Sequence, residues 1–362
     1  MFVTGIFPPE IGGPASYIPR IAKELSLRHS VRVITLGDSL KSDGDYSFEL
    51  HRVPKCSKVK RYWLTVQKIR MLLGDTDVVI TNGLYLETAL AVNGKRPIIA
   101  KVVGDTVWER ARSSQAYGIS LEDFQKNQGS IKWALLHKLQ RKCFKSFSSV
   151  FTPSDYLADV VRGWGVDPKR VDVIPNAVER LPIEDLRPEV DLVTVARLVP
   201  WKGLVELIDL AVMKNWSLSI VGDGPMREEL ALQIKASGSN KIFLRGGVPQ
   251  KQVARELRRG RVFVLNSSYE GLPHIVLEAK SAGVPVVASN AGGTIETIND
   301  RKDGRLVPVG KTKQLGLVLG ELLGDEQERI KLRNAGYSQI EKEFSLKQMA
   351  IKTERLIAQN VS

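Results

Sequence analysis

Short apolar runs alternate with stretches whose apolar residues recur every three or four positions along most of this chain. In the first half, the short runs predict strands at 2–6, 31–36, 78–81, 98–103, 149–152 and 171–174. The periodic stretches predict helices near 15–28, 58–73, 85–93, 131–145 and 154–163. Strands that alternate with helices are typical of parallel sheets in α/β domains.

The second half repeats this pattern after a break at 175–189, which is rich in proline and acids and has no periodicity. We expect the linker between two domains there. Strands are predicted at 192–196, 217–221, 242–245, 262–265 and 286–289, and helices near 202–213, 225–237, 250–259, 274–282, 294–299 and 311–323. Ser345 and Gln348, preceded by Phe344, fit a capping box, so a last helix is expected near 346–359.

Length and composition agree with two domains. The chain has 362 residues, of which 43% are hydrophobic and 26% charged, enough for two sizeable cores. Cys56 and Cys143 cannot form a disulfide framework, which favours a reducing compartment. No signal peptide and no uncharged apolar run of roughly 18 residues is visible, so a cytoplasmic protein is expected.

The net charge of +13 is concentrated in the first half. Residues 1–176 carry 26 Lys or Arg and 17 Asp or Glu, and the remainder carries 27 and 23. Such an excess suits nucleic acid, an anionic membrane or an anionic substrate. Because no recognisable nucleic-acid module is present, no nucleic-acid partner is expected and a membrane surface is favoured.

The helix expected at 58–73 has two interpretations. One face carries Val59, Tyr62, Trp63, Val66, Ile69 and Leu73, and the surroundings carry Lys58, Lys60, Arg61, Lys68 and Arg70. A basic amphipathic helix with aromatic residues can lie on an anionic bilayer. The same pattern also fits an ordinary helix whose apolar face packs on a sheet.

The richest candidate chemistry lies at residues 270–278. Glu270 and Glu278 bracket a turn and a helix start that includes Pro273, and proline suits the first position of a helix. Backbone N–H groups at a helix start bind phosphate, and nearby carboxylates suit sugar hydroxyls. A nucleotide-sugar carries both kinds of group. His274 is either a phosphate donor there or an ordinary helix residue.

Other loops after predicted strands could also hold an anion. Arg197 and Lys202 follow strand 192–196 and could clamp a diphosphate, although solvated loop cations look the same in sequence. Glycine-containing turns that suit close approach of a phosphate occur at Gly222-Asp223-Gly224-Pro225, at Ala291-Gly292-Gly293-Thr294 and at Gly12-Gly13-Pro14. Each is as readily a plain turn, but together they favour a phosphate-bearing ligand.

Metal and triad chemistry have little support. Asp43 and Asp45 have the spacing of a carboxylate pair but no supporting ligands, so no metal site is expected. The four histidines show no zinc spacing and no order typical of a nucleophilic triad.

Taken together, these motifs resemble the retaining glycosyltransferases of family 4, also known as glycosyl transferases group 1. The resemblance covers nearly the whole chain and is densest from Val193 to Ile298. It implies the GT-B fold, with two Rossmann-like domains of parallel sheets facing across a cleft. Residues 1–175 would bind the acceptor, 176–343 would bind the nucleotide-sugar donor, and 344–362 would form a helix returning to the first domain.

The resemblance also assigns roles. It implies that Arg197 and Lys202 hold the donor diphosphate, that Glu270 contacts the donor sugar and that Glu278 contacts the ribose. Further donor contacts are implied for Gly12, Gly13, Gly222, Gly224, Leu272, Pro273, His274, Ile275, Gly292, Gly293 and Thr294. Many relatives carry a histidine where this chain has Gly104-Asp105, so Asp105 either takes the role of that histidine or shapes the acceptor site.

The function implied is retaining transfer of a hexose-type sugar from a UDP- or GDP-sugar to a carbohydrate or lipid-linked acceptor, as in polysaccharide biosynthesis. No metal or other cofactor is expected. The site of action would be the cytoplasm or the inner face of the membrane, which helix 58–73 would contact. Two alternatives stay open: a GT-B nucleotide-sugar epimerase and a basic, non-catalytic binding protein.

Overall fold

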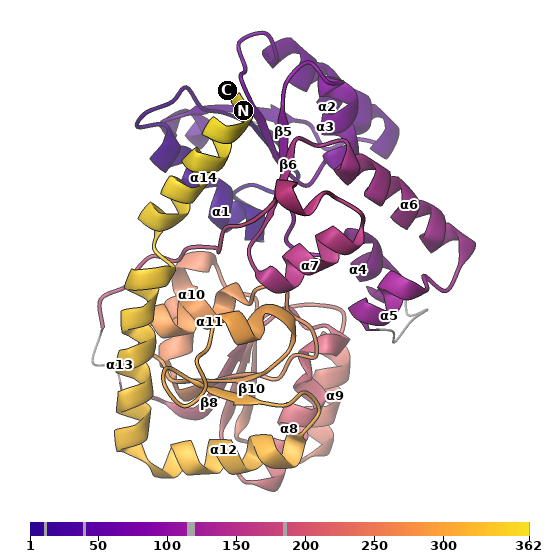
Figure 1. Ribbon diagram of the computed structural model, residues 1–362. Helices are drawn as coiled ribbons and strands as arrows, with labels where there is room; N and C mark the ends of the chain where they lie inside the picture. The colour runs from indigo at the N-terminus through magenta and orange to yellow at the C-terminus, as the bar shows by residue number, and fades with distance from the viewer. Residues whose placement is uncertain (11–12, 39–40, 114–119, 184–186, 362) are drawn as a thin grey trace. The chain divides into compact units, whose positions relative to one another are not determined.

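The computed structural model describes residues 1–10, 13–38, 41–113, 120–183 and 187–361 (Figure 1). The chain divides into two compact units. Unit 1 comprises Met1–Asn176 and Leu346–Ser362, and unit 2 comprises Ala177–Ser345. The boundaries expected after residues 175 and 343 lie close to these divisions.

Within the described residues, unit 1 contains one seven-stranded parallel sheet with the order β3-β2-β1-β4-β5-β6-β7. The strands are β1 (Phe2–Thr4), β2 (Arg32–Leu36), β3 (Glu49–Val53), β4 (Val79–Asn82), β5 (Ile98–Lys101), β6 (Ser149–Thr152) and β7 (Val171–Val173). All residues of β4, β5 and β6 are buried, as expected for the centre of a parallel sheet with both faces covered.

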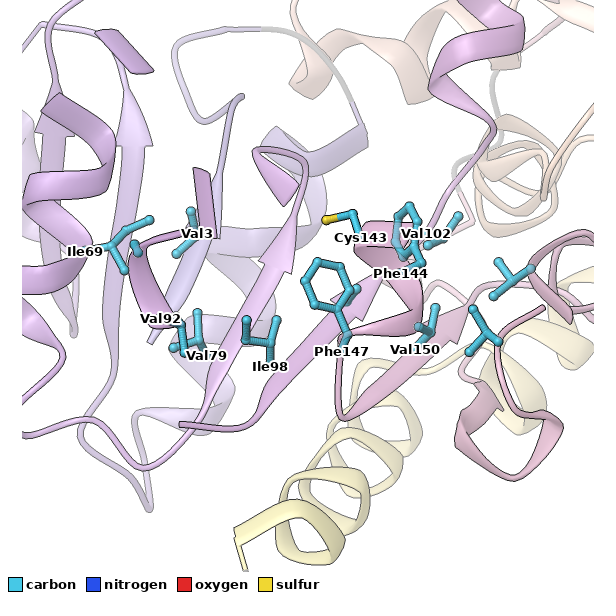
Figure 2. Close-up of a cluster of buried hydrophobic side chains, with 14 of the residues drawn as sticks. Val3, Ile69, Val79, Val92, Ile98, Val102, Cys143, Phe144, Phe147 and Val150 are labelled. Carbon is cyan, nitrogen blue, oxygen red and sulfur yellow. The ribbon is translucent and has the colours of Figure 1, made fainter. Parts of the chain in front are cut away.

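The helices of unit 1 cover both faces of this sheet. They are α1 (Gly13–Leu25), α2 (Lys58–Leu72), α3 (Tyr85–Val92), α4 (Thr106–Ser113), α5 (Leu121–Lys126), α6 (Ile131–Lys145), α7 (Asp155–Gly163) and α14 (Leu346–Val361). Right-handed crossovers place α2, α3, α6 and α7 on one face and α1 on the other. Figure 2 shows the apolar cluster on the first of these faces, where Ile69, Phe144 and Phe147 pack with strand residues such as Val79 and Val150.

The last helix of the chain belongs to unit 1. Helix α14 packs against α1. Arg28 donates two hydrogen bonds to the Glu354 carboxylate at 2.9 and 3.0 Å, and the Ser149 hydroxyl donates to Asn360 Oδ1 at 3.0 Å. These contacts confirm the helix expected to return to the first domain.

In the described part of unit 2, six parallel strands follow the order β10-β9-β8-β11-β12-β13. They are β8 (Val190–Val195), β9 (Leu218–Val221), β10 (Ile242–Gly246), β11 (Gly260–Leu265), β12 (Val286–Ser289) and β13 (Arg305–Val307). The helices are α8 (Leu204–Met213), α9 (Arg227–Ala236), α10 (Gln250–Arg258), α11 (His274–Ser281), α12 (Thr312–Gly324) and α13 (Glu326–Glu343).

Sequence predictions in both units need correction. The helix expected at 294–299 is wrong, because Gly292–Glu296 forms a 3₁₀ turn instead. Gly292 has a left-handed φ of 48°, and the β-branched residues that follow it favour a helix poorly. The pattern also missed α13, whose buried positions include the small Gly336 and the polar Gln339. Strands β3 and β13 and helices α4 and α5 were missed as well.

A buried lysine ties three segments of unit 2 together. The Lys280 side chain on α11 is 1% exposed, and its ammonium donates to Thr297 O at 2.6 Å, Asp303 Oδ1 at 2.6 Å and Gln339 Oε1 at 2.7 Å. Burial lowers the pKa of Lys280, and the Asp303 carboxylate opposes that shift. Helix α11 is thereby fixed to α13 and to the loop before β13.

Candidate active site

The candidate donor residues of unit 2 gather at one edge of its sheet. Strands β8, β9, β11 and β12 are parallel neighbours, so the loops that follow their carboxyl ends lie along the same edge. These loops carry Arg197, the turn at 222–225, Glu270 and the turn at 291–294. Ligands of open parallel sheets bind at this edge.

Lys202 and Glu270 meet in an ion pair. Lys202 ends the 3₁₀ turn Pro200–Lys202, and its Nζ lies 2.5 Å from Glu270 Oε1. Their side chains are only 14% and 11% exposed. The Glu270 carbonyl also accepts the N–H of Gly293 at 2.9 Å, which joins the loop after β11 to the loop after β12. The pair therefore places one cation and one carboxylate together in a largely shielded position.

Arg197 lies on the loop after β8, the same loop that carries Lys202. Its side chain is exposed, and the guanidinium lies 5.4 Å from the ring centroid of the buried Trp201. The Trp201 carbonyl accepts the N–H of Ser268 at 2.8 Å, so the Arg197 loop is tied to the loop that carries Glu270. The guanidinium of Arg197 is therefore exposed to solvent, while the loop that carries it is held in place.

Gly222 and Gly224 have a structural reason to be glycine. Their φ angles are 141° and 158°, and a Cβ on each would lie 1.9 Å from Ala196 O and 2.5 Å from Leu198 O, respectively. Leu198 N donates to Asp223 O at 2.9 Å in the same contact. The turn therefore packs directly against the backbone on either side of Arg197.

Gly203 makes a similar close approach. Its φ is 59°, a Cβ there would lie 2.3 Å from Asn266 O, and Asn266 Nδ2 donates to Gly203 O at 2.9 Å. Sequence reasoning missed Asn266 and Trp201, which hold the loops of the pair. Asn266 is the first residue after β11, and that position was the available signal.

The start of α11 differs slightly from expectation. Pro273 is buried at the N-cap, and the helix begins at His274. The ring nitrogens of His274 lie 3.1 Å from Glu278 Oε1 and 3.3 Å from Ala177 O, and Gln250 Nε2 donates to Glu278 Oε1 at 2.5 Å. These contacts hold the imidazole against the protein, which leaves the N–H groups of the first turn as the better candidates for phosphate.

The side chains of Leu272 and Ile275 point into apolar clusters. Leu272 packs with Val178 and Phe344, and Ile275 packs against the core under α11. Both side chains are only partly buried, and the backbone of this segment leads into the start of α11. This arrangement is compatible with the backbone contacts implied for residues 272–275.

Two backbone N–H groups of the turn at 292–294 already donate hydrogen bonds within the protein. Gly293 N donates to Glu270 O, and Thr294 N donates to Ala291 O at 3.0 Å. The Thr294 hydroxyl is fully buried and has no hydrogen-bond partner among the described residues. The expected row of free N–H groups is therefore reduced at this turn.

The glycine loop of unit 1 is only partly described. Gly12 lies outside the described residues. Gly13 is the first residue of α1 and is exposed, and a Cβ built on it would have no heavy atom within 4 Å. Among the described residues, none would obstruct a side chain at Gly13.

Asp105 is completely buried and fully paired. Its Oδ1 accepts the N–H groups of Val107 and Trp108 at 3.0 and 3.1 Å, which caps α4. Gln125 Nε2 donates to Oδ2 at 2.8 Å, and Gln140 Nε2 donates to Oδ1 at 3.2 Å. These contacts indicate that the Asp105 carboxylate stabilises the loop after β5.

A buried histidine completes this polar cluster. His137 on α6 is 3% exposed, and its Nε2 lies 3.8 Å from Asp105 Oδ2. Burial lowers the pKa of His137, while Asp105 raises it and Arg141 lowers it further. Sequence reasoning missed the link between Asp105, His137 and the two glutamines, because these residues are distant in the chain.

No metal site is evident in the part of the chain that the structure describes. It contains no group of three His, Cys, Asp or Glu residues arranged to hold an ion. Asp43 instead accepts two hydrogen bonds from the Arg52 guanidinium at 2.7 and 2.8 Å. The arrangement at Asp43 is an ion pair within unit 1.

Helix α2 divides its apolar face between two environments. Val66 and Ile69 are fully buried in the core, whereas Val59 and Trp63 are 71% and 52% exposed. Packing on the sheet therefore explains only the second half of the helix. Across the described residues, every helix is too short or too polar to cross a bilayer.

Comparison with known proteins identifies related glycosyltransferases. The sequence model described as Glycosyl transferases group 1 matches residues 187–339, and the one described as Glycosyltransferase Family 4 matches residues 11–180. The chain is 27% identical over 369 residues to the GDP-mannose-dependent alpha-(1-6)-phosphatidylinositol monomannoside mannosyltransferase of Mycolicibacterium smegmatis, covering 93% of this chain and 92% of that protein. It is also 27% identical over 241 residues to the amylovoran biosynthesis glycosyltransferase AmsK of Erwinia amylovora, covering 59% of each chain.

Solved structures share the fold. Anabaena HepE in complex with UDP and glucose has a TM-score of 0.79 at 18% identity, and 99% of each chain is covered. Sucrose-phosphate synthase of Thermosynechococcus elongatus has a TM-score of 0.80 at 17% identity, with 99% of this chain and 98% of that chain covered. The GT-B fold class expected from the sequence is confirmed.

Proposed function

This chain belongs to the family 4 glycosyltransferases, the glycosyl transferases group 1, and from that premise we propose that it moves a hexose-type sugar from a nucleotide diphosphate sugar to an acceptor with retention at the anomeric carbon. The observation that carries the proposal is the shielded pair of Lys202 and Glu270 at the carboxyl edge of the sheet. It supplies a cation for a diphosphate and a carboxylate for sugar hydroxyls side by side.

In the proposed reaction, the diphosphate of the donor competes with Glu270 for the Lys202 ammonium. Arg197 and the first-turn N–H groups of α11 add positive potential as the bond to the sugar breaks. Glu270, released from part of its pairing, accepts hydrogen bonds from the donor sugar, and Glu278 accepts them from the ribose. The leaving phosphate takes the proton of the acceptor hydroxyl, so that no separate protein base is required.

We propose a UDP- or GDP-sugar as donor. HepE was solved with UDP and glucose, and the mycobacterial relative is GDP-mannose-dependent by name. We propose a carbohydrate or lipid-linked acceptor in polysaccharide biosynthesis, reached at the inner face of the membrane. Names of relatives that refer to phosphatidylinositol monomannoside and amylovoran support this class of acceptor. No observation favours the epimerase or the non-catalytic alternative.

The test begins with thermal-shift measurements against UDP, GDP and ADP, followed by turnover of the corresponding sugars. We expect Lys202→Ala to lower turnover by about 10²- to 10³-fold, which is the usual cost of removing one group that stabilises developing charge. The matched control is Lys214→Ala, which removes an exposed lysine at the end of α8. Near-normal turnover in a folded Lys202→Ala protein would overturn the proposed diphosphate clamp.

A further inference from the structure

Helix α6 carries an exposed apolar stripe that its packing does not explain. Ile131, Leu135 and Leu139 follow each other at intervals of four residues and are 90%, 58% and 45% exposed. The opposite side of α6 supplies its core contacts, through buried residues that include Trp133 and Phe144. The stripe is therefore additional to the face that holds the helix on unit 1.

Two neighbouring helices also carry exposed apolar residues. Val59 and Trp63 on α2 are exposed, and Leu86 and Leu90 on α3 are 51% and 38% exposed. Helix α2 packs on α3, α3 packs on α6, and the Arg70 guanidinium donates to Leu90 O at 3.2 Å. The three helices lie on the same side of the unit 1 sheet (Figure 1). We call this surface the α2–α3–α6 face.

The charge of this face is predominantly positive. Helices α2 and α6 carry Lys58, Lys60, Arg61, Lys68, Arg70, Lys132, Lys138, Arg141, Lys142 and Lys145, and no acidic residue. Glu87 is the one acidic residue of α3. Unit 1 as a whole has 29 Lys or Arg against 18 Asp or Glu, while unit 2 has 24 against 22.

We propose that the α2–α3–α6 face docks on an anionic lipid bilayer. Exposed Ile, Leu and Trp side chains can enter the boundary between headgroups and acyl chains, while lysines keep their ammonium groups among the lipid phosphates. Each Lys or Arg near an anionic surface adds a favourable contribution that falls with salt.

Other occupants fit this face less well. A second copy of the chain would bring two strongly basic surfaces together, and like charges oppose such contact. A nucleic acid would pair with the lysines but would leave Ile131, Leu135 and Leu139 in water. A bilayer with acidic lipids satisfies both the charge and the apolar stripe.

The test is co-sedimentation of the full-length protein with vesicles, without donor or acceptor, so its outcome is separate from that of the transfer reaction. Vesicles contain phosphatidylcholine alone, or phosphatidylcholine with phosphatidylglycerol in equal parts, at low and high sodium chloride. The apolar variant is Ile131→Gln/Leu135→Gln/Leu139→Gln. The charge variant is Lys132→Gln/Lys138→Gln/Lys142→Gln.

A matched control replaces three exposed apolar residues of unit 2. Met213→Gln/Leu232→Gln/Leu317→Gln changes side chains that are 69%, 67% and 66% exposed. Glutamine is a good helix former, and circular dichroism verifies that each variant is folded.

We expect wild-type protein and the unit 2 control to bind anionic vesicles equally, with weaker binding at high salt. The apolar and charge variants should each bind about tenfold more weakly or worse. The proposal is overturned if wild-type protein binds neutral and anionic vesicles equally or neither. It is also overturned if the α6 variants lose no more vesicle binding than the control. A further contradicting result would be a dimer of the wild-type protein that persists at high salt in size-exclusion chromatography and is lost in the α6 variants.

Discussion

Replacing Asp105 by asparagine separates a structural from a catalytic role for this carboxylate. The substitution keeps the size of the side chain but turns one acceptor oxygen into an NH₂ donor. If the amide oxygen continues to cap α4, the new NH₂ group faces Gln125 Nε2, which is also a donor. Gln125 cannot simply flip, because its Oε1 accepts the Trp164 indole N–H at 2.9 Å.

The magnitude follows from these contacts. One charged hydrogen bond is lost and buried donors are left facing each other, which costs about 2–4 kcal/mol. For a unit of this size the melting temperature should fall by about 4–16 °C. Turnover at 20 °C, measured where the protein remains folded, should stay within about threefold of wild type, since the Asp105 side chain is 0% exposed and both of its oxygens accept hydrogen bonds from the protein.

The assay combines thermal unfolding, followed by circular dichroism, with turnover of the nucleotide-sugar identified by thermal shift. The control is Asp325→Asn at the exposed N-cap of α13, where the carboxylate accepts Glu328 N at 2.9 Å. Asparagine caps helices as well as aspartate, so this control should cost under about 0.5 kcal/mol. A melting temperature equal to wild type with turnover reduced by about 100-fold or more would refute the structural assignment.

Three further predictions concern other buried or constrained groups. Lys280→Met should lower the free energy of unfolding by about 3–5 kcal/mol in denaturant titrations, because the Asp303 carboxylate loses its buried counter-charge. Gly222→Ala should weaken nucleotide binding in calorimetry, since its Cβ would collide with Ala196 O. Gly324→Ala, which has no positive φ and nothing within 4 Å of its Cβ, should leave binding unchanged. Because the pKa of His137 is lowered in the folded protein, the unfolded chain binds more protons just below pH 6.5, and stability should fall as the pH drops from 7 to 5. His137→Gln should show a smaller fall between these pH values in urea unfolding, and an equal fall would contradict the assignment.

The sequence pattern was sufficient where apolar residues were periodic or continuous. The central strands of both sheets and helices such as α6 and α10 follow directly from it. Helix α13 was missed because its buried side consists partly of Gly336 and Gln339, which serve the Lys280 contact and close packing instead of an apolar stripe. Apolar periodicity cannot detect a helix whose buried face contains small and polar residues.

The candidate site was predictable in its parts but not in its pairing. The residues Lys202 and Glu270 could be selected as a cation and a carboxylate after neighbouring strands, yet their 2.5 Å contact depends on the fold. The same limit applies to Asp105. Its place just before α4 is a sequence signal for an N-cap, but its other partners come from α5 and α6 and become visible only in the structure.

From the sequence, the glycine turns beside the candidate site could be either plain turns or phosphate-binding turns. The structure shows that a plain turn can itself serve the site. Gly222 and Gly224 lie against the backbone that flanks Arg197, and Gly203 lies against Asn266 just after β11. A plain turn at these positions is therefore what fixes the loops of Arg197 and Lys202, whether or not a phosphate touches the glycines. Substitutions in these turns should act by displacing the cations, while substitutions of Lys202 should act on charge alone. A variant that leaves both loops in place but removes the ammonium group consequently tests the chemistry, and a glycine variant tests the framework that positions it.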